Sequence, residues 1–228
     1  MRQLRDISCD QCQLKCDLWL TAREMNMTDE LKPFNHLYRK HETISRQGEE
    51  ITHAMILLDG NAKIYIDGIN RKSIILNILI PSNYIGLMAV FGSARYKYNI
   101  EAITDCTTCH IDIEVVKKMY HGNQNFMQKL NTAIGDSVSS IMSKLISLNQ
   151  KQVRGKVAES LLYLSQLYDS KKYTLTLTRK ELGELSAISE ENTVRVLAEF
   201  RDEGIIEISG REIEIKESDL LRKISTIG

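Results

Sequence analysis

Apolar and polar positions change their pattern along the chain, and the first clear pattern is that of short β-strands. From Glu42 onward, short apolar segments are separated by glycine, aspartate, asparagine or proline. These segments run over Ala54 to Leu58, Ala62 to Ile66, Ser73 to Ile80 and Ala102 to Ile113. Several short strands with turn residues between them predict a small antiparallel barrel or roll. Before them, Thr28 marks a capped helix start with Pro33 soon after it, so we expect a helix there that is short or begins late.

The pattern becomes helical from Asn125 to Tyr168, with no proline and a weak break at Gly155. Apolar residues recur there at intervals of four, three, four and three, which places Ile134, Val138, Ile141, Leu145 and Leu148 on one face. So narrow a stripe on a long helix is typical of pairing with a second copy. Packing of the stripe on its own β-roll is the alternative. A second helix is expected over Val153 to Tyr168.

The stretch from Leu177 to Phe200 contains two short amphipathic helices. Thr178, with Glu181 three residues later, forms a capping box that opens the first helix, and Ser189 caps the second. Two capped helices with a tight break between them predict a helix-turn-helix, although an αα-hairpin in another core would look similar. The alternating run Ile205 to Ile215 then predicts a β-hairpin, which makes the arrangement a winged helix.

Composition adds a constraint on how such a domain would bind DNA. The chain has 228 residues, enough for two modest domains, and its formal net charge is zero. From Ser170 onward there are ten Lys and Arg against twelve Asp and Glu. Because phosphate binding normally needs a basic surface, we expect a few well-placed cations and two copies acting together. The most apolar run, Ile74 to Pro81, is too short to span a bilayer, so we expect a cytoplasmic protein without membrane contact.

Five cysteines bring in a different chemistry. Cys9, Cys12 and Cys16 lie within eight residues, and Cys106 and Cys109 form a second group. An odd number in two small groups indicates a reducing compartment with metal or redox chemistry. Three neighbouring thiols with a remote fourth are a common way to hold a [4Fe-4S] cluster. Two C-x2-C pairs would also suit a tetrahedral zinc site.

With these elements in order, the chain resembles the Crp-Fnr family of bacterial transcription regulators over nearly its whole length. Three motifs carry the resemblance: ISRQGEEITHAMILLDGNAKIYI (44–66), YIGLMAVF (84–91) and LTRKELGELSAISEENTVRVL (177–197). It implies an α+β fold with an N-terminal antiparallel β-roll, a jelly roll of the cyclic-nucleotide-binding type. A long dimerisation helix and a C-terminal winged helix-turn-helix follow. The expected parts are a cysteine segment (1–20), a sensor roll (21–122), the dimerisation helix (123–150) and the DNA-binding domain (151–228).

The resemblance also implies that the protein is a homodimer reading palindromic double-stranded DNA, with RNA polymerase as a further partner. Glu191 and Arg195 match the family's E-x-x-x-R pair, and on one helix face they can read cytosine and guanine. The expected DNA-binding set is Thr178, Arg179, Ser189, Glu190, Glu191, Asn192, Thr193 and Arg195. Within it, Thr178, Arg179, Ser189 and Thr193 are expected to meet phosphates. Glu190 stands where cyclic-AMP receptors have arginine, which predicts a different base pair there.

The ligand or redox signal that the sensor roll detects is harder to predict than DNA binding. Cyclic-AMP receptors hold the nucleotide with an Arg-Ser pair and a glutamate, whereas the matching positions here are Tyr96, Lys97 and Leu87. A buried phosphodiester would lack its partners, unless the neighbouring Arg95 replaced them, so we do not expect a cyclic nucleotide.

The oxygen sensors of the family instead hold an iron-sulfur cluster with an N-terminal cysteine group and one strand cysteine. Those positions match Cys9, Cys12, Cys16 and Cys109, with Cys106 as a competitor for the last. The spacing departs from the family's usual C-x2-C-x5-C, because it is C-x2-C-x3-C here. We therefore expect sensing of oxygen, nitric oxide or redox state through a [4Fe-4S] cluster.

The alternatives for the sensor are zinc or thiol chemistry, haem, another small ligand or none. Haem would take a ligand from His36, His41, His53, His110 or His121. No nucleophile-base arrangement, P-loop or dinucleotide fingerprint occurs, so we do not expect an enzyme. A protein-interaction module that does not bind DNA is the remaining alternative.

Overall fold

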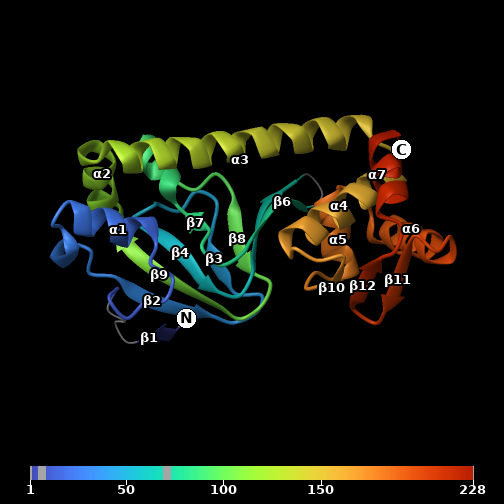
Figure 1. Cartoon of the computed structure of the whole chain (residues 1–228), viewed down its shortest axis with the longest axis horizontal. Helices are drawn as coiled ribbons and strands as arrows, with labels where there is room; N and C mark the ends of the chain where they lie inside the picture. The colour runs from blue at the N-terminus through green and yellow to red at the C-terminus, as the bar shows by residue number, and fades with distance from the viewer. Residues whose placement is uncertain (1, 5–8, 69–72, 228) are drawn as a thin grey trace. The chain divides into compact units, whose positions relative to one another are not determined.

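The computed structural model describes residues 2–4, 9–68 and 73–227, and the chain divides into two compact units (Figure 1). The first unit comprises residues 1–65 and 77–139, and the second comprises residues 66–76 and 140–228. Residues 1 and 5–8 of the expected cysteine segment lie outside the described residues.

The first unit is built on two sheets, as the strand pattern predicted. One sheet has the order β1-β2-β9-β4-β7 and the other β3-β8-β5-β6. Strand β9 is central to the first sheet and pairs antiparallel with both β2 and β4. The strands are β1 (Arg2–Leu4), β2 (Phe34–Tyr38), β3 (Thr43–Ser45), β4 (His53–Asp59), β5 (Ala62–Asp67), β6 (Ser73–Leu79), β7 (Tyr84–Ile85), β8 (Asn99–Ala102) and β9 (Cys106–Asp112).

The expected single strand from Ala102 to Ile113 is wrong, because it is two strands and the start of a helix. Strand β8 ends at Ala102, β9 begins at Cys106, and Ile113 opens helix α2 (Ile113–Gly122). The Asp112 carboxylate caps that helix by accepting a hydrogen bond from the Glu114 amide at 2.7 Å. Side-chain capping of this kind is what turns an extended chain into a helix at a defined residue.

Three further helical segments cover the roll. Helix α1 (Asp17–Glu24) was not predicted, and it buries Leu18 and Ala22 completely in the core. The segment η1 (Thr28–Glu30) is a single 3-10 turn, as short as expected before Pro33, but the expected cap at Thr28 is wrong because the N-cap is Met27 and no side chain caps the turn. The segment η3 (Leu87–Phe91) lies between glycines of positive φ at Gly86 and Gly92.

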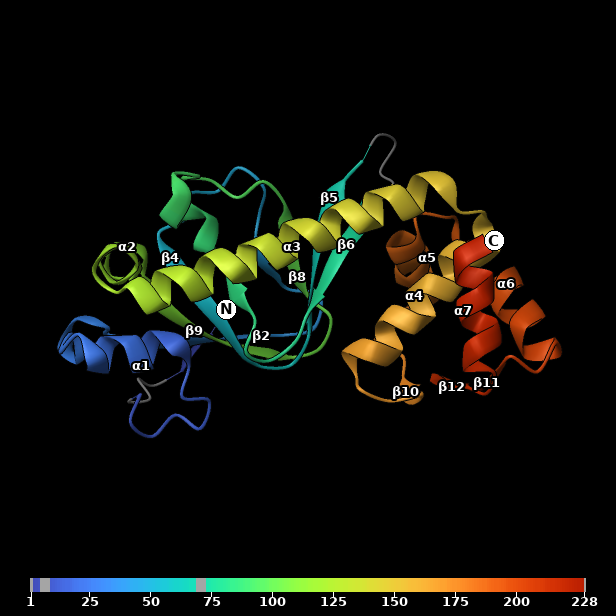
Figure 2. The same ribbon diagram turned by 45° about the horizontal axis from the view of Figure 1, so that its top comes forward.

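The two predicted long helices are confirmed as α3 (Gln124–Gln150) and α4 (Val153–Leu167). Figure 2 shows α3 as one uninterrupted helix. Ile134, at the start of its apolar stripe, packs on the core of the first unit, whereas the middle of the stripe is exposed, by 50% at Val138, 41% at Ile141 and 58% at Leu145.

The second unit contains the predicted winged helix, with α5 (Arg179–Ser186), α6 (Glu190–Asp202) and the hairpin of β11 (Ile206–Ser209) and β12 (Glu212–Ile215). Two elements were not predicted: β10 (Lys172–Thr174), which pairs with β12, and the last helix α7 (Ser218–Ile227). The capping box of Thr178 and Glu181 and the cap at Ser189 are confirmed.

Candidate functional site

Four of the five cysteines lie close together, although they come from two separate segments. Cys9, Cys12 and Cys16 are on the loop that leads into α1, and Cys109 is on β9. Burial raises the pKa of the Cys109 thiol to about 12, and the charges of Cys9, Cys16 and Cys12 raise it further. Burial and the charges of Cys16 and Cys12 likewise raise the pKa of Cys9 to about 11. Each thiolate therefore makes the next one harder to form.

Cys106 does not belong to this group, because it lies three residues from Cys109 on the same strand. Successive side chains of a strand point to opposite faces, so an odd separation puts the two sulfurs on different faces. The Cys106 thiol is fully buried and donates to the carbonyl oxygens of Asn61 at 3.1 Å and Thr104 at 3.2 Å. This geometry does not support a zinc site made from Cys9, Cys12 and both strand cysteines.

The donor set fits a thiolate-bound metal centre. Metal binding requires deprotonated thiols, and the raised pKa values mean that a cation would offset a charge that the site otherwise resists. Lys15 is the nearby cation, but its Nζ donates to backbone carbonyls of Cys9 and Asp10. In the part of the chain that the structure describes, no three of these sulfurs lie within 4.8 Å of one another. Sulfurs on one tetrahedral zinc lie roughly 3.8 Å apart, so this spacing is wider than a mononuclear site needs.

The cysteine loop is connected to the rest of the unit through Cys16. This residue is the N-cap of α1, and the amides of Leu18 and Trp19 favour its thiolate while burial raises its pKa. The next residue, Asp17, accepts a hydrogen bond from Lys129 Nζ on α3 at 2.7 Å. The hydroxyl of Tyr84, whose pKa burial raises strongly, lies beside the same helix start. These contacts connect the cysteine loop to α1, and α1 to α3.

The region that would hold a cyclic nucleotide is filled. Tyr96, at the position of the receptors' arginine, is 5% exposed, and its ring contacts Tyr98 at 6.1 Å between centroids. A Cβ on Gly86 would lie 3.1 Å from the Tyr96 hydroxyl, so the tyrosine packs directly on the turn before η3. Arg95 is exposed, and its Nη1 donates to the carbonyl of Gly48 at 2.8 Å.

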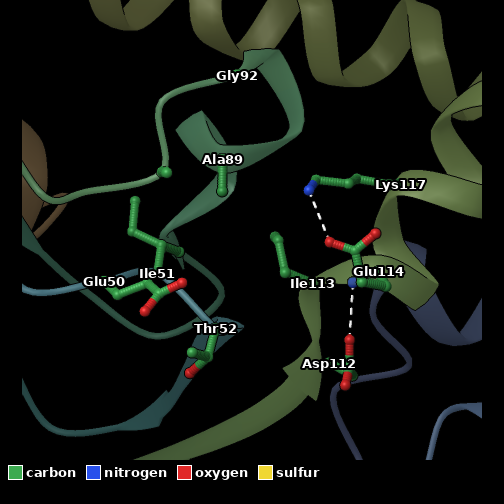
Figure 3. A pocket seen from close by; sticks show the side chains of 10 residues that line it. Glu50, Ile51, Thr52, Ala89, Gly92, Asp112, Ile113, Glu114 and Lys117 are labelled. Atoms are coloured by element: carbon green, nitrogen blue, oxygen red, sulfur yellow. Dashed lines mark hydrogen bonds and ion pairs between the residues drawn. The ribbon is translucent and has the colours of Figure 1, made fainter.

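A nearby pocket of about 350 Å³ also has the wrong charge for a phosphodiester (Figure 3). Its lining includes the carboxylates of Glu50, Asp112 and Glu114. The one lysine of the lining, Lys117, is paired with Glu114 at 2.7 Å and so already has an anionic partner. An anionic ligand would meet net negative charge there.

The histidines proposed as haem ligands are mostly packing residues of the sheet. His110 stacks on Phe34 with ring centroids 4.9 Å apart, and its Nε2 lies 2.8 Å from the Thr108 hydroxyl. Burial, followed by the charges of His36 and His53, lowers the pKa of His110 to about 3. His41 and His121 are both exposed on the surface. Nothing in this arrangement sets one imidazole apart as an axial ligand.

In the second unit, the turn between α5 and α6 depends on one glycine. A Cβ on Gly183 would lie 2.9 Å from Thr193 Oγ1 and 3.0 Å from the Ile188 carbonyl oxygen. Any larger residue would push the two helices apart, so the close approach explains the glycine inside a helix. Ala187 follows in the left-handed region with φ 51° and ends α5.

The N-terminal half of α6 exposes acidic, apolar and basic side chains. Glu190, Glu191, Val194 and Arg195 are exposed, whereas Asn192 is half-buried. The expectation that Thr193 meets a phosphate is corrected, because its side chain is fully buried and its Oγ1 donates to the Ser189 carbonyl at 3.0 Å.

The sequence reasoning missed Arg211, a cation of the wing that lies close to the expected Arg179. The Nη1 atom of Arg179 is buried and finds no hydrogen-bond partner among the described residues. Burial and then the charge of Arg211 lower the pKa of Arg179, so two guanidinium groups face the same region. Arg211 is held there by the carbonyls of Leu175, Thr176 and Leu177. Two adjacent cations at a helix start would suit a phosphate.

Comparisons with known proteins agree with this architecture. Residues 35–123 match the family described as "Cyclic nucleotide-binding domain", and residues 155–224 match the "Crp-like helix-turn-helix domain". The "Fumarate nitrate reduction regulatory protein" of Klebsiella oxytoca is 21% identical over 96% of this chain and 90% of its own. The "cAMP-activated global transcriptional regulator CRP" of Salmonella typhimurium is 24% identical over 79% of this chain and 88% of its own.

A solved structure shares the fold. The structure of FixK2 from Bradyrhizobium japonicum has a TM-score of 0.80 at 19% identity, covering 86% of this chain and 98% of that one. Across the described residues, no helix has both the length and the apolar character needed to cross a membrane.

Proposed function

Because this chain belongs to the Crp-Fnr family of DNA-binding transcription regulators, which are dimeric and are not enzymes, we propose that it senses oxygen, nitric oxide or redox state through a cysteine-bound [4Fe-4S] cluster. The observation that carries this proposal is the position of Cys109 beside Cys9, Cys12 and Cys16. Three thiols on a short loop and one on a rigid strand can wrap the corners of a cluster. When bound, the cluster would supply a link between loop and strand that oxygen or nitric oxide can break.

The chain's own residues would carry the change to α3. Cys16 caps α1, and Asp17 pairs with Lys129. Release of the loop would free this helix start and alter how α3 packs on a second copy through Val138, Ile141 and Leu145, whose exposure supports a dimer. Two-state elements of this kind couple a sensor to a distant site without direct contact.

The DNA end would then respond through the spacing of two α6 helices on a palindromic site. Glu191 and Arg195 are exposed for base reading, and Arg179 with Arg211 supplies the concentrated cations that an acidic domain requires. RNA polymerase is the further partner that we propose for the DNA-bound dimer.

The matched pair Cys109→Ala and Cys106→Ala tests the sensor. In anaerobically purified full-length protein we expect about four iron and four sulfide per chain for the wild type and for Cys106→Ala. Cys109→Ala should hold far less of both. A wild type without iron or acid-labile sulfide would contradict the proposal, and a single zinc per chain would favour the zinc alternative.

A further inference from the structure

The proposed base-reading arginine is held by its own helix. Arg195 Nη1 donates to Glu199 Oε1 at 2.5 Å, and Nη2 donates to Asn192 Oδ1 at 3.3 Å. Glu191, the residue expected to share base reading with Arg195, is not part of this contact. Glu199 therefore decides where the guanidinium lies before DNA arrives.

The carboxylate of Glu199 is itself fixed from a second helix. Its other oxygen accepts a hydrogen bond from Arg154 Nη1 of α4 at 3.0 Å. Arg154 also makes a two-point contact with Glu203, at 2.8 and 2.7 Å, and lies over the Phe200 ring at 5.0 Å. Bidentate pairing and ring stacking hold a guanidinium in one orientation. The chain of contacts thus runs from Arg154 through Glu199 to Arg195.

Helix geometry makes this arrangement stable. Arg195, Glu199 and Glu203 are spaced four residues apart, so they lie above one another on one face of α6. Arg154 spans the last two of them. Its charge helps to compensate Glu199 and Glu203, the two carboxylates that follow Arg195 on this face.

A held arginine reads a base better than a free one. An unrestrained arginine loses considerable rotamer freedom on forming a two-point contact with guanine, and pre-orientation reduces that loss. A guanidinium has five N–H donors, and the contacts to Glu199 and Asn192 use two of them. Donors remain for the guanine O6 and N7 atoms.

We propose that Glu199 and Arg154 are positioning residues for base reading by Arg195, an inference that rests on the proposed function. Arg154 is the second residue of α4, a helix that begins three residues after α3 ends. The contact chain therefore links the start of α4, which follows the long helix closely in sequence, to the base-reading face. Movement of α3 would reach the DNA contact through this chain.

The test begins with the anaerobic full-length wild type and a pool of DNA duplexes with two randomised half-sites. The enriched duplex is then compared with variants in which one base pair at a time is exchanged, using fluorescence anisotropy. Arg195→Ala identifies the guanine pair that Arg195 reads. We expect wild-type discrimination of at least about tenfold at that pair, and a loss of most of it in Glu199→Gln, with other pairs unchanged.

Two variants separate positioning from stability. Asp202→Asn removes a carboxylate of α6 that pairs with Arg201 and with none of the three residues of the contact chain, so it should keep the discrimination within about twofold. In the Arg195→Ala background, Glu199→Gln should cause no further loss at the same pair. A merely structural role would instead weaken binding at every pair.

The outcomes distinguish the positioning role of Glu199 and Arg154 from the proposed function. If Arg195→Ala loses the discrimination and Glu199→Gln keeps it, the positioning role is wrong and base reading by Arg195 stands. If Arg195→Ala keeps full discrimination, or if the wild type enriches no duplex, the proposed function fails and the positioning role with it.

Discussion

The ammonium group of Lys129 lies 2.7 Å from a carboxylate oxygen of Asp17, which joins the residue after Cys16 to the first turns of α3. Both side chains are largely exposed, so the pair by itself adds little to folding stability. Leu18 and Trp19 next to it are buried in the core of the first unit. The ion pair therefore fixes the position of the helix start, and apolar packing supplies the stability.

Reversing the charge of Asp17 should weaken the link between the cysteine loop and α3. We expect Asp17→Lys to reduce the effect of oxygen on DNA affinity by about two- to fivefold, as a single exposed ion pair allows. The double variant Asp17→Lys with Lys129→Asp should restore the effect, since it restores the pair. Anisotropy before and after air exposure measures this, and a double variant no better than the single one would refute the coupling role.

The exposed apolar stripe of α3 predicts a dimer that a single charge within the stripe would disrupt. Leu145→Glu should shift the protein to a monomer, because it places a charge within an apolar seam. Ser143→Glu adds the same charge away from the stripe and should leave the dimer intact. Analytical ultracentrifugation separates the two, and a dimeric Leu145→Glu protein would show that this stripe is not the interface.

Lys144 gives the second unit a pH dependence. Its Nζ donates to the carbonyl oxygens of Ile75 at 2.5 Å and Leu76 at 3.4 Å, and burial lowers its pKa to about 8. Between pH 8 and the normal lysine value, the unfolded chain binds more protons, so this group makes stability rise with pH. The rise should approach about 1.4 kcal/mol per pH unit.

Denaturant unfolding of wild type and Lys144→Met across this pH range measures the difference between the two curves. From pH 8 to pH 10 we expect the free energy of unfolding of the wild type to rise relative to that of Lys144→Met. Lys171→Met, at an exposed site, should follow the wild type. Parallel curves for wild type and Lys144→Met would rule out this titration.

Glu190 should affect the operator. As an exposed residue at the first position of α6, it cannot make the two-point guanine contact that arginine makes. Selection from randomised duplexes should enrich guanine at one more position for Glu190→Arg than for the wild type. Identical enriched sequences would show that this side chain does not face a base.

Much of the fold could be predicted because apolar residues recur clearly at strand spacing in the first half of the chain and at helix spacing in the second. The spacing of Ile134 to Leu148 gave a long helix, and the caps at Thr178 and Ser189 placed both helices of the DNA-binding motif. Helix α1 escaped prediction because its burial comes from packing against distant segments. Strand β10 escaped because three residues carry too little pattern.

The candidate site was predictable where the signal is local. Once β9 is placed, strand alternation puts Cys106 and Cys109 on opposite faces. Helical spacing puts Thr193 on the same buried face of α6 as Val196, Leu197 and Phe200. Contacts between distant residues carry no such signal. The Arg154–Glu199 contact joins residues 45 positions apart, and nothing in either local sequence indicates it.

The central claim is that the cysteine centre controls DNA affinity. The most direct test is the affinity of one anaerobic sample for its selected duplex before and after exposure to oxygen, with iron content followed in parallel. We predict that the wild type changes affinity by at least about fivefold as iron is lost, and that Cys109→Ala does not respond. Equal wild-type affinities in both states, or the same response in Cys109→Ala, would contradict the account.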